Sequence, residues 1–194
     1  LSLFGELGSN TLADEVSRGL PKFRTPLAGA LVRTVARTVE HQTAELRPLD
    51  IDPADVDRMI DINVRGLYHA AVDGARQMPE GGRIVILGSV NGDRMPFPGG
   101  AAYALTKSAV QGMVRGLARD FGPRGITVNS VQPGPVNTDM NPADGPMKDA
   151  MHSFMAIQRH ATPAEIAGMV AYLVGPEAGI VTGAQHTIDG GFGA

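Results

Sequence analysis

The chain lacks cysteine and tryptophan altogether, and aromatic residues make up only 5% of its 194 positions. Without cysteine it can form no disulfide, use no thiolate in catalysis and hold no cysteine-ligated metal. The lack of cysteine agrees with a reducing compartment, so we expect a cytoplasmic protein. The histidines show no metal-ligand spacing with acidic partners, and no metal site is predicted; they are His41, His69, His152, His160 and His186.

Long apolar runs and strong charge are also missing. No apolar stretch approaches the ~20 residues that a membrane-spanning helix needs. The first residues show no basic segment followed by an apolar one, so no signal peptide is expected. The formal net charge of −3 gives no reason to expect a nucleic acid or an anionic membrane as partner. With 43% hydrophobic and 19% charged residues, the composition is that of a globular protein.

From residue 50 onward, short β-branched segments alternate with amphipathic ones. Strands are predicted at 81–89, 125–133 and 183–191, and helices at 52–78, 100–121, 146–157 and 162–175. Asp52 before Pro53 marks one helix start, and Thr162 with Glu165 forms a capping box at another. This alternation predicts an α/β fold, with a parallel sheet and helices on its faces.

Residues 1–49 show a different pattern. Helices are predicted at 12–19 and 26–42, the second from apolar residues that recur every four positions. No run of four or more β-formers occurs here, so no strand is predicted. The segment "FGELGSN" offers two glycines but no third at the right spacing, and we find no phosphate-binding glycine turn in it.

A serine, a tyrosine and a lysine stand out between residues 88 and 110. Ser89 ends an apolar strand, and Tyr103 and Lys107 share one face of the following helix, four residues apart. Taken alone, such a pair is more often ordinary packing than chemistry. If it is functional, the ammonium is expected to lower the phenol's pKa from its free value of about 10, so that Tyr103 exchanges a proton with a carbonyl or alcohol oxygen. Ser89 would hold the same oxygen at the carboxyl edge of the sheet.

These three residues are followed by "NSVQPGPVNTDM" and preceded by Asn63 in "INVRG", and the chain closes with "VTGAQHTIDGG". In this order and spacing, residues 45–194 resemble the short-chain dehydrogenase/reductase family. Two segments, "RQMPEGGRIVILGSVNGDRMP" and "GLARDFGPRGITVN", look most like its bacterial subgroup of cyclic-di-GMP-binding biofilm-dispersal mediators. The resemblance implies a Rossmann-like doubly wound parallel sheet, N-terminally truncated or remodelled here. It also implies one domain over 1–194, made of the atypical segment 1–49 and a catalytic half, 50–194.

The resemblance also assigns roles to particular residues. It implies a catalytic tetrad of Asn63, Ser89, Tyr103 and Lys107, with Asn63 holding a proton-relaying water. NADP or NAD would be the cofactor, and the residues implied to contact it are Tyr103, Lys107, Pro133, Gly134, Val136 and Thr138. Relatives pair through their long helices, here 53–78 and 100–121, which implies a homodimer or homotetramer. Asp93 and Arg94 follow Ser89, and we interpret them as a solvated loop pair, with substrate contact as the alternative.

Three functions are compatible with these residues. The first is an NAD(P)-dependent oxidoreductase that reduces a ketone or oxidises an alcohol. The second, motivated by the subgroup and by the absent glycine turn, is a non-catalytic regulator that binds a cyclic dinucleotide such as cyclic-di-GMP. The third is an inactive remnant whose tetrad has no cofactor to serve. Whether the chain is an enzyme depends on whether a nicotinamide cofactor binds without the glycine-rich turn.

Overall fold

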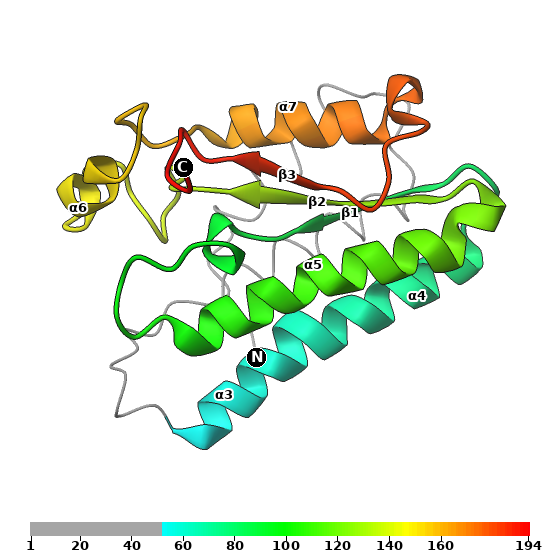
Figure 1. Cartoon of the computed structure of the whole chain (residues 1–194), viewed down its shortest axis with the longest axis horizontal. Coiled ribbons are helices and arrows are strands. Elements are labelled where there is room, and N and C mark those ends of the chain that lie inside the picture. The colour runs from blue at the N-terminus through cyan, green and yellow to red at the C-terminus, as the bar shows by residue number, and fades with distance from the viewer. Residues whose placement is uncertain (1–51) are drawn as a thin grey trace.

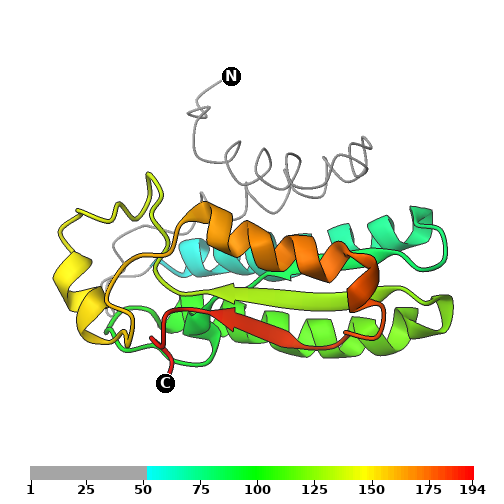
Figure 2. The ribbon, with the colours of Figure 1, turned by 90° about the horizontal axis from the view of Figure 1, so that it is seen from above.

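The computed structural model describes residues 52–194, so the helices predicted at 12–19 and 26–42 lie outside the described residues. Three parallel strands form one sheet in the order β1-β2-β3. Helices α4 and α5 lie on one side of the strands and α7 on the other (Figures 1 and 2). The predicted α/β class and parallel sheet are therefore confirmed.

The strands follow the predicted segments closely. Their bounds are Arg83–Leu87 for β1, Thr127–Pro133 for β2 and Gln185–Ile188 for β3. Six of the seven residues of β2 are buried, because this central strand is covered by helices on both faces. The register pairs Leu87 with Val131 and Pro133 with Ile188, so the carboxyl ends of all three strands meet at one edge.

Helices α3 and α7 begin where the capping signals predict. Their bounds are Pro53–Ile60 for α3, Leu67–Gln77 for α4, Ala101–Phe121 for α5, Lys148–Ser153 for α6 and Pro163–Val174 for α7. The Asp52 side chain accepts a hydrogen bond from the amide of Ala54 at 2.9 Å. Thr162 and Glu165 form the reciprocal capping box at the start of α7.

One prediction about the helices is wrong in detail. The sequence predicts a single helix over 52–78, but a π-helical turn, Asp61–Gly66, separates α3 from α4. A π turn bonds each residue to the fifth along the chain and so accommodates one extra residue. Apolar residues spaced for 3.6 residues per turn on either side of this segment give no sign of the extra residue. The turn contains Asn63, whose side chain is buried.

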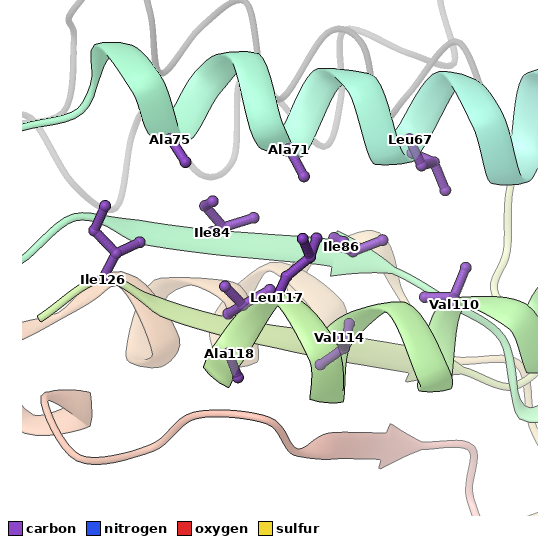
Figure 3. Close-up of a cluster of buried hydrophobic side chains, with 11 residues drawn as sticks. Leu67, Ala71, Ala75, Ile84, Ile86, Val110, Val114, Leu117, Ala118 and Ile126 are labelled. Carbon is purple, nitrogen blue, oxygen red and sulfur yellow. The ribbon is translucent and has the colours of Figure 1, made fainter. Parts of the chain in front are cut away.

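Two apolar cores hold the helices to the sheet. The first lies between α4, α5 and the strands β1 and β2, and Figure 3 shows Ala71 and Ala75 pointing toward Ile84. The second lies between α7 and the opposite face, where Ile166 and Leu173 pack against Val131 of β2. The small alanines of α4 allow that helix to approach the sheet closely. Together the two cores fix the start of α5 relative to the carboxyl edge of the strands.

Candidate active site

Lys107 is the largest fully buried side chain of the described residues, with 2% of its surface exposed. It lies in the second turn of α5, and its Nζ lies 3.5 Å from the carbonyl oxygen of Leu87 at the end of β1. Burial lowers the pKa of this amine from 10.5 to about 8. Burying an ammonium destabilises a folded chain unless it is well paired. The burial of Lys107 therefore lowers the stability of the fold, and the presence of such a residue favours a functional role.

Tyr103 and Ser89 meet beside this lysine. The Lys107 Nζ lies 5.6 Å from the centre of the Tyr103 ring, and the Tyr103 hydroxyl is hydrogen-bonded to the Ser89 side chain. Ser89 follows β1 with extended backbone and caps the 3₁₀ turn Val90–Gly92, where its Oγ accepts from the amide of Asn91 at 3.1 Å. The three side chains are thus gathered at the carboxyl edge of the sheet, as the spacing predicts.

The pKa of Tyr103 shifts in the direction opposite to the expected one. Burial raises the pKa of the Tyr103 phenol above 10.0, and the hydrogen bond from Ser89 offsets this only in part. The spacing of Tyr103 and Lys107 indicates an attraction between the ammonium and a phenolate, but the cost of desolvating that phenolate depends on the packing around the ring. Tyr103 is consequently a neutral phenol at neutral pH and is suited to donate a proton.

Asn63 is linked to Tyr103 by hydrogen bonds through Thr106, a residue that the sequence motifs do not include. Its Nδ2 lies 3.3 Å from the Oγ1 of Thr106, and that hydroxyl donates to the carbonyl oxygen of Tyr103 at 2.8 Å. Thr106 is completely buried. It lies between Tyr103 and Lys107 in sequence, and a polar residue on the buried face of a helix is the signal that could have identified it. The predicted role of Asn63 in holding a water stays a prediction.

The segment predicted to lie beside a cofactor begins where β2 ends. Pro133 closes the strand, and the amide of Gly134 donates to Ile188 O at 2.9 Å. Val136 forms an isolated parallel bridge with Ala161, and Thr138 forms an isolated antiparallel bridge with Asn141. The segment therefore begins at the same edge of the sheet as Ser89, and Thr138 is exposed.

Gly134 is required at its position by a close backbone contact. A Cβ atom there would lie 2.7 Å from both Cα and Cβ of Asp189, closer than real Cβ contacts allow. We expect Gly134→Ala to lower the free energy of unfolding by roughly 1–3 kcal/mol, as overpacking does. Gly168→Ala is the matched control, because an added Cβ there meets nothing within 4 Å and α7 should gain about 0.5–1 kcal/mol. Urea unfolding measures both, and equal effects of the two substitutions would contradict the close contact.

The loop after Ser89 differs in part from its prediction. Asp93 is exposed, as expected, but its carboxylate accepts hydrogen bonds from Gln111 and Gln132 rather than from Arg94. Arg94 donates instead to the carbonyl oxygens of Phe192 and Ala194, each at 2.8 Å. These partners are distant in sequence, so local spacing could not reveal them.

Two histidines join α6 to the segment before α7. His152 Nε2 lies 2.8 Å from His160 Nδ1, and His160 is 5% exposed, with its Nε2 buried and without a partner among the described residues. Burial, and secondarily repulsion from His152, lowers the pKa of His160 below 6.5. The folded state therefore binds this proton less tightly than the unfolded state does, and stability is lost as the pH falls below 6.5.

The pH dependence of unfolding tests this lowered pKa. Between about pH 7 and about pH 5.5, we expect the free energy of unfolding to fall, and His160→Gln to reduce that fall by roughly 1 kcal/mol. His69→Gln is the control, since His69 is exposed on α4. An unchanged pH dependence in the His160 variant would show that this imidazole is not protonated on unfolding.

Among residues 52–194, no three histidine, cysteine or acidic side chains are grouped so that they could hold a metal ion. No helix in that same range has the length and apolar character needed to cross a bilayer.

Fold and site together define a class of protein. Its features are a parallel Rossmann-like sheet with helices on both faces, and a group of Ser89, Tyr103 and Lys107 at the carboxyl edge, where such sheets bind ligands. The family model described as enoyl-(acyl carrier protein) reductase matches residues 29–193. The chain belongs to this short-chain dehydrogenase/reductase family, which confirms the resemblance and the fold class that it implied.

Two curated relatives are similar to the chain in sequence. The chain is 68% identical over 146 residues to the cyclic-di-GMP-binding biofilm dispersal mediator protein of Escherichia coli K12, covering 75% of this chain and 62% of that protein. It is 37% identical over 154 residues to the oxidoreductase UcpA of the same strain, covering 74% and 59%. The chain thus spans about three fifths of the length of these relatives.

Solved structures of the family match as well. BdcA in complex with NADPH has a TM-score of 0.75 and 57% identity, covering 84% of this chain and 72% of that one. A short-chain dehydrogenase from Burkholderia cenocepacia J2315 in complex with NADP has a TM-score of 0.75 and 38% identity, covering 96% and 73%. Related chains with this fold therefore bind a phosphorylated nicotinamide dinucleotide.

Proposed function

We propose that the protein is an NAD(P)-dependent oxidoreductase that interconverts a ketone and an alcohol. One observation carries the proposal: the Tyr103 hydroxyl is hydrogen-bonded to Ser89 beside Lys107, a buried amine whose pKa is about 8. Groups that exchange protons work best when their pKa lies near the working pH, and the pKa of Lys107 does, whereas Tyr103 keeps its proton until the reaction removes it. A buried amine with such a pKa is a costly feature that packing alone does not require.

The site suits the nicotinamide end of the cofactor. Among residues 52–194, the Lys107 Nζ has a single acceptor, Leu87 O at 3.5 Å, although an ammonium carries three donor hydrogens. The remaining donors suit the hydroxyl groups of a ribose. We propose that Lys107 and Tyr103 hold this ribose and that Pro133, Gly134, Val136 and Thr138 contact the nicotinamide and its neighbouring phosphate. The cofactor, when bound, supplies the hydride.

The chain's own residues handle the substrate oxygen and its proton. Ser89 would donate a hydrogen bond to that oxygen and fix its position. Tyr103, a neutral phenol in this structure, would give the oxygen a proton during reduction. Lys107 lies close enough to stabilise the phenolate that remains, and Asn63 would hold a water that returns a proton toward Lys107. Since NADPH or NADP is bound in related structures, NADP(H) is the cofactor that we propose first, and NAD(H) second.

Calorimetric titration of the purified chain with NADPH, NADH and cyclic-di-GMP in separate runs tests the proposal. We expect NADPH to bind and a panel of ketones to be reduced with loss of absorbance at the nicotinamide band. Because the sequence contains no recognisable glycine-rich turn, the adenosine half of the cofactor must be held by other residues. Failure of both nicotinamides to bind would overturn the oxidoreductase proposal for this chain and leave the tetrad without a cofactor, as in an inactive remnant.

A second candidate function is binding of a cyclic dinucleotide without turnover. It is favoured by the 68% identity to a protein named as a cyclic-di-GMP-binding biofilm dispersal mediator. In the same titration, tight binding of cyclic-di-GMP with no ketone reduction would support this regulator over the enzyme. Competition between cyclic-di-GMP and NADPH would place both ligands at one site.

We also propose that the chain assembles as a homodimer or homotetramer through α4 and α5. Tyr68 on α4 is 47% exposed and Leu105 on α5 is 57% exposed, which leaves large apolar side chains on these neighbouring helices uncovered. Light scattering coupled to size exclusion should give at least a dimeric mass, and Leu105→Asp should lower it. A monodisperse monomer would contradict the assembly. The cytoplasm remains the location that the cysteine-free composition predicts.

A further inference from the structure

The 3₁₀ turn that follows Ser89 is held in place by side chains of two other elements. The Ser108 hydroxyl on α5 donates to the carbonyl oxygen of Gly92 at 2.6 Å. Gln111, one turn further along α5, donates from Nε2 to Asp93 Oδ1 at 2.6 Å. Gln132 on β2 donates to the other carboxylate oxygen of Asp93. Asp93 is therefore the residue at which the Ser89 turn, α5 and β2 are joined.

The glutamine partner from the sheet is deeply buried. Gln132 is 1% exposed and lies in the central strand, directly before Pro133. Its Oε1 lies 3.3 Å from Gln111 Nε2, and the Gln111 carbonyl oxygen in turn accepts from Gln185 on β3 at 3.3 Å. A buried amide that loses its partner costs about 1–3 kcal/mol. Gln132 thus depends on the Asp93 carboxylate, and the turn depends on Gln132.

Only a carboxylate matches this arrangement. Both partners direct an NH₂ group at Asp93, so both of its side-chain oxygens must accept. An ionised aspartate is an acceptor only, and hydrogen bonds to it are stronger than those between neutral groups. An asparagine of the same shape would direct its own NH₂ at one of the two glutamines and repel it.

The turn itself has no room to shift toward the helix. A Cβ atom at Gly92 would lie 3.0 Å from the backbone C and O of Lys107. Inside the turn, the amides of Asn91 and Gly92 donate to Ser89, to its Oγ at 3.1 Å and to its carbonyl oxygen at 3.0 Å. The orientation of the Ser89 hydroxyl is therefore coupled to how firmly this turn is held against α5.

We propose that Asp93 is a positioning residue, whose carboxylate fixes the Ser89 turn between Gln111 and Gln132 and so holds the Ser89 hydroxyl at Tyr103. Its consequence for catalysis rests on the proposed oxidoreductase function. The effect of Asp93 on the order of the turn is independent of that function, because it can be measured without a substrate.

Hydrogen exchange followed by mass spectrometry tests the structural part, with Asp93→Asn as the variant and Asp120→Asn, an exposed aspartate of α5, as the control. We expect the amides of Asn91 and Gly92 to exchange roughly tenfold faster in Asp93→Asn and at the wild-type rate in Asp120→Asn. Adding Gln132→Glu to Asp93→Asn should slow the exchange again. The double variant again pairs a carboxylate with an amide, now with the carboxylate at position 132 and the amide at position 93.

Steady-state kinetics test the catalytic part. In Asp93→Asn we expect kcat for ketone reduction to fall roughly tenfold, with KM for NADPH unchanged, and the double variant to recover part of kcat. The proposal would be overturned if Asn91 and Gly92 exchanged at the wild-type rate in Asp93→Asn, or if faster exchange spread over all three strands. It would also be overturned if the double variant exchanged as fast as Asp93→Asn alone. If the wild-type chain reduces no ketone, the proposed function fails, while the exchange rates still decide the positioning role.

Discussion

Tyr103→Phe is expected to lower kcat for ketone reduction by ~10²–10⁴-fold, the usual contribution of a positioned proton donor. The substitution removes only the hydroxyl oxygen, which in the structure is hydrogen-bonded to Ser89. Since the ring remains, cofactor binding measured by calorimetry should change by less than about tenfold, and the free energy of unfolding by about 1 kcal/mol.

The control for this experiment is Tyr172→Phe, because Tyr172 lies on α7 and is 46% exposed. Its kcat should equal that of the wild-type chain. A Tyr103 variant that kept more than a tenth of the wild-type kcat would show that another group delivers the proton. A variant that lost NADPH binding altogether would show that the Tyr103 hydroxyl acts mainly by holding the ribose and would contradict its role as the proton donor.

Lys107→Met is expected to abolish ketone reduction and, at the same time, to make the fold more stable. Lowering the pKa of a lysine from 10.5 to about 8 means that the folded state binds the proton less tightly than the unfolded chain does. Stability is then lost as the pH falls from 10.5 toward 8, and the loss at pH 7 corresponds to roughly 3 kcal/mol. Methionine fills a similar volume without a charge, so we expect the free energy of unfolding to rise by roughly 1–3 kcal/mol.

Urea unfolding at two pH values distinguishes this cause from better packing. If the buried charge is responsible, the advantage of the Lys107→Met variant should shrink by about half between about pH 7 and about pH 9.5, as the wild-type amine loses its proton. Lys148→Met is the control, because Lys148 is exposed at the start of α6 and its replacement should leave stability unchanged. A destabilised Lys107 variant would mean that the ammonium is well paired in the folded state.

If both results are obtained, the buried Lys107 lowers the free energy of unfolding while the reaction requires it. Active sites commonly keep buried charges that a more stable protein would lack. The contrast with Gly134 is informative, since its close contact with Asp189 leaves no space for a Cβ atom, and its replacement should cost stability without a compensating gain.

Local patterns in the chain were enough to predict the order of the elements and the residues of the candidate site. Apolar periodicity and glycine or proline boundaries placed β1, β2, β3 and the starts of α3, α5 and α7, because these signals are local and need no knowledge of the partner elements. The four-residue spacing of Tyr103 and Lys107 placed both on one helix face for the same reason. Parallel strands bring their carboxyl ends to one edge, so Ser89 and Gly134 could also be expected there.

The long-range hydrogen bonds of these groups and the pKa of Tyr103 follow only from the packing of separate elements in the tertiary structure. The π turn at Asn63 adds one residue to a helix whose periodicity looks ordinary, and the bond from Gln132 to Asp93 joins residues 39 positions apart. The pKa of Tyr103 is raised because desolvation outweighs its hydrogen bond, and desolvation depends on everything packed around the ring. Spacing along a chain records which residues can meet on one element, whereas burial and long-range hydrogen bonds arise only when separate elements pack together.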